Sequence, residues 1–287
     1  MWLALALFSA LFAGITAILS KIGLKDTDSN VATAVRTVVV LLFSWLMVLI
    51  TGVGGELSSV SARALLFLCL SGLATGASWL CYFRALQLGN VNRVAPIDKS
   101  STILTMLLAF ILLGERVTWL KCGAMALILL GTLMMIQKKE AADKKEGRAW
   151  LVYAVLSAVF AALTSILGKV GIENVNSNLG TALRTIVVLI MAWTMVFVTR
   201  KTGEVRKIDR RSMLFILLSG LATGLSWLCY YGALHDPAAL VSVVTPLDKL
   251  SILPTVLFAR VFLREKLTKR GVFGLCLLTG GTLMLLI

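Results

Sequence analysis

Residues 9–48 read "SALFAGITAILSKIGLKDTDSNVATAVRTVVVLLFSWLMV", and residues 157–196 read "SAVFAALTSILGKVGIENVNSNLGTALRTIVVLIMAWTMV". The two stretches align without a gap and are identical at roughly half of their positions. Further along, "SGLATGASWLCY" (71–82) returns as "SGLATGLSWLCY" (219–230). Self-similarity at a fixed spacing indicates that one structural unit is used twice. The chain is therefore predicted to consist of two copies of the same fold.

Composition decides what kind of fold is repeated. The chain has 287 residues, of which 59% are hydrophobic and only 15% charged, and its mean hydropathy is +0.93. A helix that spans a bilayer needs roughly 20 mostly apolar residues. Such runs occur at about 2–22, 31–50, 63–86, 92–113, 118–136, 149–169, 180–199, 212–234, 239–263 and 269–287. The sequence therefore predicts an all-α polytopic membrane protein with ten transmembrane helices.

The ten spans divide equally between the copies. The first copy is predicted to cover residues 1–138 and the second 149–287, with a charged linker loop at 139–148. Five spans are an odd number, so the second copy enters the membrane from the opposite side. We therefore expect inverted repeats, an architecture that places a binding site near the midplane between the halves and alternates access to it by rocking.

Several short motifs add a resemblance to this pattern. The fourth span of the first copy contains "APIDKSS" (95–101) and ends in "LLGE" (112–115), and the second span contains "AVRTVVV" (34–40). Together with the doubled five-span unit, these motifs resemble the EamA branch of the drug/metabolite transporter superfamily, with two single-repeat members fused in tandem. The resemblance implies transport without indicating a substrate. The second copy departs from the family pattern at Arg264, where glycine is usual.

Basic residues change loops between the copies and so stay on one side of the membrane. The second loop of the first copy, "TGVGGELSSVSAR", is almost uncharged, whereas its counterpart is "TRKTGEVRKIDRR". The side that lacks most of the basic residues holds only Arg63, Arg116 and Lys121. Cytoplasmic loops carry the excess of Lys and Arg. We therefore predict cytoplasmic loops at 137–148 and 200–211 and extracytoplasmic termini in the cell (inner) membrane, although ten-span family members are usually drawn with both termini inside.

A matched set of charges remains inside the spans of each copy. Each set contains a lysine that ends the first span, an arginine in the second span and an Asp-Lys pair early in the fourth: Lys21, Arg36, Asp98 and Lys99, and Lys169, Arg184, Asp248 and Lys249. Buried charges are costly unless they are paired or hydrated. One interpretation is static Arg36–Asp98 and Arg184–Asp248 bridges with lysines that reach the interface. The other is a water-filled pathway in which the two pairs form alternately as gates, with the carboxylates able to carry protons.

Aromatic and small residues recur beside these charges. Trp79 and Tyr82 return as Trp227 and Tyr230, one turn apart on a helix face, and they fit either a cavity wall or an interfacial belt. The glycines of "SGLATG", four residues apart, predict close helix packing. Two glutamates at the ends of the fourth and ninth spans, Glu115 and Glu265, are expected to pair with the adjacent Arg116 and Lys266.

The remaining observations narrow the class of function. The sequence contains no nucleophile–base pair, phosphate-binding loop or metal-ligand spacing, so we expect no enzyme, cofactor or metal. The leading prediction is a secondary transporter of a small metabolite or drug-like solute, driven by protons or exchange, with membrane lipids as its surroundings and no nucleic-acid partner. A flippase for a lipid or lipid-linked head group, and an assembly factor without flux, are the alternatives. Monomer and homodimer both remain open. Each charge set has a formal charge of +2, which favours an anionic or zwitterionic substrate.

Overall fold

The computed structural model describes residues 1–24, 27–88, 94, 97–135, 149–262 and 268–287. Every element of secondary structure in these residues is helical. The first copy forms α1 (Trp2–Gly23), α2 (Ser29–Ile50), α3 (Ala62–Leu88), α5 (Ser101–Leu112) and α6 (Trp119–Met135). The second copy forms α7 (Ala149–Ile172), α8 (Ser177–Val198), α9 (Arg210–His235), α10 (Val241–Asp248), α11 (Ile252–Phe262) and α12 (Lys269–Met284). The predicted linker 139–148 lies outside the described residues, as do Lys25, Arg93, Arg264, Glu265 and Lys266.

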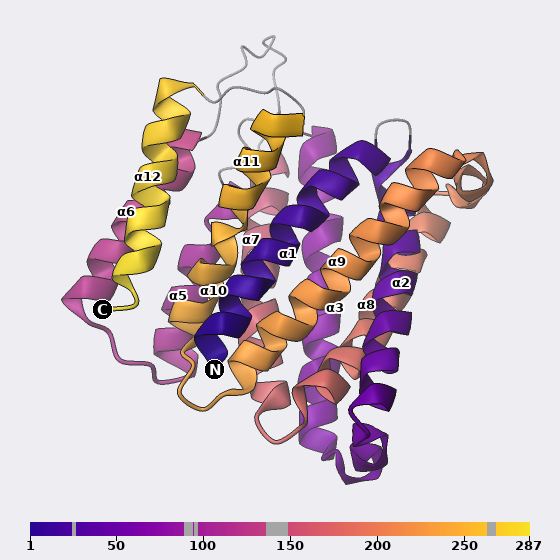
Figure 1. Cartoon of the computed structure of the whole chain (residues 1–287), viewed down its shortest axis with the longest axis horizontal. Helices are drawn as coiled ribbons and strands as arrows, with labels where there is room; N and C mark the ends of the chain where they lie inside the picture. Colours follow the sequence, from indigo (N-terminus) through magenta and orange to yellow (C-terminus); the bar gives the residue numbers. More distant parts are fainter. Residues whose placement is uncertain (25–26, 89–93, 95–96, 136–148, 263–267) are drawn as a thin grey trace.

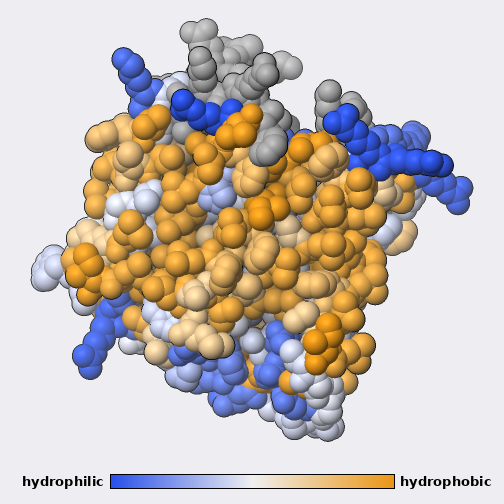
Figure 2. All heavy atoms as spheres, viewed as in Figure 1, coloured by the Kyte–Doolittle hydropathy of each residue, from blue (hydrophilic) through white to orange (hydrophobic). Residues whose placement is uncertain are grey.

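The apolar helices confirm a multi-pass membrane protein. Seven described helices are long and apolar enough to cross a bilayer, counting Val241–Phe258 as one. Of the ten predicted spans, the other three correspond to the shorter helices α5, α6 and α12, so the number ten stays a prediction. Figure 2 shows a mostly apolar band across the middle of the molecule, with hydrophilic residues gathered at both ends.

Corresponding helices of the two copies run in opposite directions. In Figure 1, α1 rises from the end that carries both termini, whereas α7 descends toward it. The same reversal relates α2 to α8 and α3 to α9. We call the end with the N and C termini the termini end. The opposite end, where the 3₁₀ helix η2 (Thr202–Lys207) joins α8 to α9, is the η2 end.

The copies are intertwined, because most long helices pack against a helix of the other copy. α3 lies along α7 and α1 along α9, while α6 packs on α12 and α2 on α8. Glycines make the α3–α8 contact close: a Cβ added to Gly72 would lie 2.8 Å from Val187 Cβ, and one on Gly76 would lie 2.5 Å from Met191 Cβ. Gly220 makes the equivalent approach of α9 to α2. The predicted packing role of "SGLATG" is confirmed.

The fourth span of the second copy is broken in its middle. The sequence predicted one helix over 239–263, but α10 ends at Asp248, a 3₁₀ turn η3 covers Lys249–Ser251, and α11 starts at Ile252. Pro254 lacks the amide hydrogen that would bond to the Leu250 carbonyl in a continuous α-helix. The tighter turn therefore falls at the Asp-Lys pair and brings Lys249 to the interior of the bundle.

Candidate functional site

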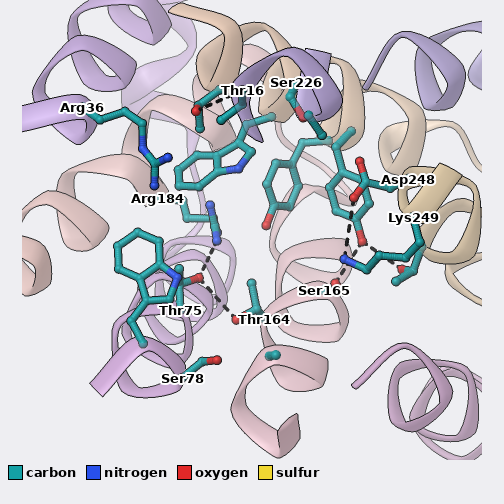
Figure 3. A pocket seen from close by; sticks show the side chains of 18 residues that line it. Thr16, Arg36, Thr75, Ser78, Thr164, Ser165, Arg184, Ser226, Asp248 and Lys249 are labelled. Carbon is teal, nitrogen blue, oxygen red and sulfur yellow. Dashed lines mark hydrogen bonds and ion pairs between the residues drawn. The ribbon is translucent and has the colours of Figure 1, made fainter. Parts of the chain in front are cut away.

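A central cavity of about 380 Å³ lies between the two copies. Its wall contains six pairs of residues that occupy corresponding positions in the two copies and are identical within each pair. They are Ala13 and Ala161, Thr16 and Thr164, Arg36 and Arg184, Thr75 and Thr223, Ser78 and Ser226, and Trp79 and Trp227. Figure 3 shows the two arginines on one side of this cavity and Asp248 and Lys249 on the other. The cavity therefore lies where the symmetry of the repeat is centred.

Arg184 is the most enclosed charge of the cavity wall, with only 2% of its surface exposed. Its Nε donates a hydrogen bond to Ser71 Oγ at 3.0 Å, and its Nη2 donates to Thr75 Oγ1 at 2.5 Å. The guanidinium carbon lies 4.9 Å from the ring centroids of both Trp227 and Tyr231. Its Nη1 is buried without a partner among the described residues. α8 is thus connected through one side chain to α3 and α9.

Arg36, the counterpart of Arg184, is held less firmly. Its Nη1 donates to Ser20 Oγ at 3.0 Å, while its Nε is buried without a partner among the described residues. Arg36 also borders a second cavity of about 400 Å³, which Arg184 does not reach. The two copies therefore differ in conformation around residues that are identical in sequence.

The predicted Arg–Asp pairs are wrong for this conformation. Asp248 Oδ1 accepts a hydrogen bond from Ser9 Oγ at 2.6 Å, and Asp248 Oδ2 lies 3.8 Å from Lys249 Nζ. Asp98 Oδ1 accepts from Ser157 Oγ at 3.1 Å. Neither arginine forms an ion pair with either aspartate within the described residues. Hydroxyl groups accept hydrogen bonds from both arginines instead, aromatic rings flank Arg184, and serines from the other copy donate to the aspartates.

Sequence reasoning missed these serines. Ser9 belongs to the first copy but bonds to Asp248 of the second, and Ser157 reciprocally bonds to Asp98 of the first. Both serines are fully buried. Their signal was a hydroxyl repeated identically at corresponding positions in two mostly apolar spans.

The second cavity extends from the central one toward the η2 end. It shares Arg36, Trp79 and Lys249 with the central cavity and adds residues near the start of α2 and the end of α3. These include Tyr82, together with Asp98 and Lys99 of the fourth span. The predicted aromatic residues therefore all face cavities rather than the lipid interface: Trp79, Trp227 and Tyr230 line the central cavity and Tyr82 the second.

Toward the termini end the cavity is closed. The Tyr230 hydroxyl lies 2.9 Å from Ser165 Oγ and from Thr245 Oγ1, which joins α9 to α7 and α10. Tyr231 packs edge-on against Tyr230, with 5.2 Å between ring centroids. Beyond this layer lies the main hydrophobic cluster, which includes Leu234 and Leu247. Tyr82, the counterpart of Tyr230, lines the second cavity.

A carboxylate of the first copy closes the termini end further. Glu115 Oε1 accepts the Val241 amide at 2.6 Å, and Oε2 accepts the Ser242 amide at 3.1 Å. Glu115 thereby caps α10, whose own N-cap residue Leu240 provides no side-chain bond. The predicted pairing of Glu115 with Arg116 is wrong, because unbonded amides at a helix N-terminus bind a carboxylate better than an exposed neighbouring guanidinium does.

The two lysines at the ends of the first spans do not line the described cavities. Lys169 Nζ donates to the carbonyl groups of Leu234, Asp236 and Ala239, and so fixes the connection between α9 and α10. Lys21 is exposed at the η2 end of α1. The described residues contain no cluster of three or more His, Cys, Asp or Glu side chains able to hold a metal ion.

Comparisons with known proteins follow the same division into two copies. A family model described as the EamA-like transporter family matches residues 1–137 and 148–287. A protein from Sinorhizobium sp described as "Uncharacterized transporter in cobO 3'region" is 44% identical over 134 residues, which cover 47% of this chain and 95% of the relative. A solved structure described only as "Crystal structure of protein" has a TM-score of 0.80 at 15% identity, over 99% of this chain and 96% of that one. This last match shows a shared fold.

Proposed function

Because the chain belongs to the EamA-like transporter family, we propose that it is a secondary transporter of a small solute that works by alternating access. In this proposal ten spans form two inverted five-helix repeats. The solute binds in the central cavity, and the structure represents the state that is accessible from the η2 end. Protons or a counter-solute provide the driving force.

One observation carries the proposal: identical residues in the two copies are packed differently at the two ends. Arg184 is enclosed by hydroxyl groups and aromatic rings, whereas its counterpart Arg36 also borders the second cavity. Inverted repeats that exchange these two arrangements would close the η2 end and open the termini end. The six identical pairs in the wall of the central cavity would bring the energies of the exchanged states closer together.

The orientation can be tested separately from transport. We expect the termini end to be extracytoplasmic because the exposed basic residues of η2 and the start of α9 lie at the other end. Single cysteines at Ser59 and Gly203, placed in a cysteine-free background, should react with an impermeant maleimide from opposite sides of intact cells and inverted vesicles. Ser59 should react from outside. Labelling of Gly203→Cys in intact cells would show that the protein has the opposite orientation to the one expected.

Flux through the central cavity tests the function itself. Purified protein in proteoliposomes should release part of a loaded metabolite mixture, detected by mass spectrometry. Ala161→Phe should abolish release because Ala161 lines both the central and the second cavity. Leu221→Phe is the matched control, since Leu221 is exposed on the apolar surface of α9. Release that is insensitive to Ala161→Phe would contradict the proposed pathway, and translocation of a fluorescent phospholipid in the same vesicles would favour the flippase.

A further inference from the structure

A third cavity of about 380 Å³ lies beside the central one, and we call it the lateral cavity. It is formed by α1, α5, α6, η3, α11 and α12. Its wall is largely apolar and includes Ile128, Met135, Ile252 and Leu278. The central and second cavities have a different character, since hydroxyl and charged groups make up much of their walls. A polar and an apolar compartment therefore lie side by side in the bundle.

Two lysines stand where these compartments meet. Lys249 lines all three cavities, and Lys99 lines the second and the lateral cavity. They come from opposite copies and line the same two cavities. Lys99 Nζ makes no hydrogen bond or ion pair within the described residues. Lys249 has only the 3.8 Å contact with Asp248, and 42% of its side chain is exposed to the cavity space.

The balance of charge around this junction is positive. The central and second cavities are lined by four basic side chains and two carboxylates: Arg36, Arg184, Lys99 and Lys249, and Asp98 and Asp248. Ser157 and Ser9 already donate to the two carboxylates, and Arg184 is enclosed by hydroxyl groups and aromatic rings. An anionic group placed between Lys99 and Lys249 would be attracted by both ammonium groups, because opposite charges at short range attract each other.

We propose that the transported solute is a small amphiphilic monocarboxylate whose carboxylate lies between Lys99 and Lys249 while its apolar body occupies the lateral cavity. The statement that this solute is transported rests on the proposed function, whereas the statement that it binds does not. It specifies the substrate class from the juxtaposition of a lysine pair and an apolar compartment. A neutral or cationic head group would gain no attraction from the two lysines, and a carboxylate without an apolar body would leave the lateral cavity unfilled.

Equilibrium binding to the purified full chain tests the substrate class without requiring flux. The probes are hexanoate, hexanamide, hexylamine and acetate, measured by calorimetry in detergent. Hexanoate should bind at least about tenfold more tightly than the uncharged amide and the amine. A close charge pair in a binding site changes the dissociation constant by more than about tenfold. Acetate should bind on the order of a hundredfold more weakly, because each buried methylene contributes about a fourfold factor. Equal affinity for hexanoate and hexanamide would overturn the inference.

Variants separate the two halves of the proposed site. Lys99→Gln and Lys249→Gln should each weaken hexanoate binding at least about tenfold and leave hexanamide unchanged. Thr132→Phe places a large side chain in the lateral cavity and should lower the affinity for hexanoate to that for acetate. Leu133→Phe, on the exposed side of α6, is the control and should leave the affinity for hexanoate unchanged. If both lysine variants have normal melting temperatures and bind hexanoate as tightly as the wild type, the proposed site is wrong.

A lipid is the competing occupant, and a further arm of the experiment addresses it. Lysophosphatidylglycerol is titrated against the same protein with and without hexanoate. Binding of hexanoate that is insensitive to the lysolipid, or only weakly competed, supports the small carboxylate. Lysolipid binding without hexanoate binding overturns it. If hexanoate binds but proteoliposomes show no flux of any solute, the proposed function is contradicted and the binding site is supported. If solutes are transported but hexanoate does not bind, the proposed function is supported and the binding site is contradicted.

Discussion

Replacing Glu115 by glutamine is expected to expose the central cavity to the termini end. The Glu115 carboxylate accepts two backbone amides of α10. Hydrogen bonds to a charged group contribute about 1.5–3 kcal/mol each. The amide of glutamine has one acceptor oxygen, and its NH₂ group would face the second backbone donor. Loss of about 2–4 kcal/mol from the closed state would raise the population of the state open at the termini end by roughly 30- to 1000-fold.

Reactivity of a cavity cysteine measures this shift. Ala13→Cys in a cysteine-free background places a small thiol on the wall of the central cavity. An impermeant maleimide added at the termini end should label it at least about tenfold faster when Glu115→Gln is also present. Glu56→Gln in the loop helix η1 (Val53–Ser59) is the matched control, since Glu56 is exposed at the same end. Equal labelling rates with and without Glu115→Gln would show that this cap does not hold the bundle closed.

Arg184→Lys is expected to reduce flux nearly as much as Arg184→Ala, by about a hundredfold. The guanidinium bonds to Ser71 and Thr75 and stacks between Trp227 and Tyr231, so it joins three helices at the wall of the cavity. A lysine ammonium keeps the charge but lacks the planar fork that contacts all four partners. Loss of two charge-assisted hydrogen bonds alone corresponds to about 3 kcal/mol.

Proteoliposome flux and the melting temperature in detergent are measured together for this series. Arg200→Ala is the control because Arg200 is exposed after α8. The expected pattern is a loss of flux in both Arg184 variants, with a smaller loss of stability in Arg184→Lys. Retention of flux by a folded Arg184→Lys protein would contradict a requirement for the guanidinium geometry and reduce the role of this residue to charge.

The helical fold and the doubling of the chain could be predicted from the sequence. Long apolar runs admit few alternatives in a membrane protein, and the match of 9–48 with 157–196 is dense enough to align helices individually. The repeated residues Trp79 and Trp227 could also be singled out, since large aromatic residues deep in a span stand out, but the sequence left a cavity wall and an interfacial belt as alternatives.

The partners of the buried charges could not be predicted in the same way. Pairing Arg36 with Asp98 assumed that charges within one copy face each other. The chain instead packs α1 on α9 and α3 on α7, which brings Ser9 to Asp248 and Ser157 to Asp98. Sequence periodicity gives the buried face of a helix but not the identity of the helix that covers it. Glu115 was misassigned for the same reason, because its partners are backbone amides 126 and 127 residues away.

The reciprocal serine–aspartate contacts have a consequence for ancestry. Each aspartate takes its hydrogen bond from the other copy, so one copy in isolation completes neither contact and encloses only part of each cavity. A gene that encodes a single copy can rebuild the chamber only if its product inserts in both orientations and two products assemble head to tail. Such a protein needs loops with little excess of lysine and arginine on either side. A chain that joins both copies is free of that requirement, and residues 200–211 concentrate basic residues that the corresponding loop of the first copy lacks.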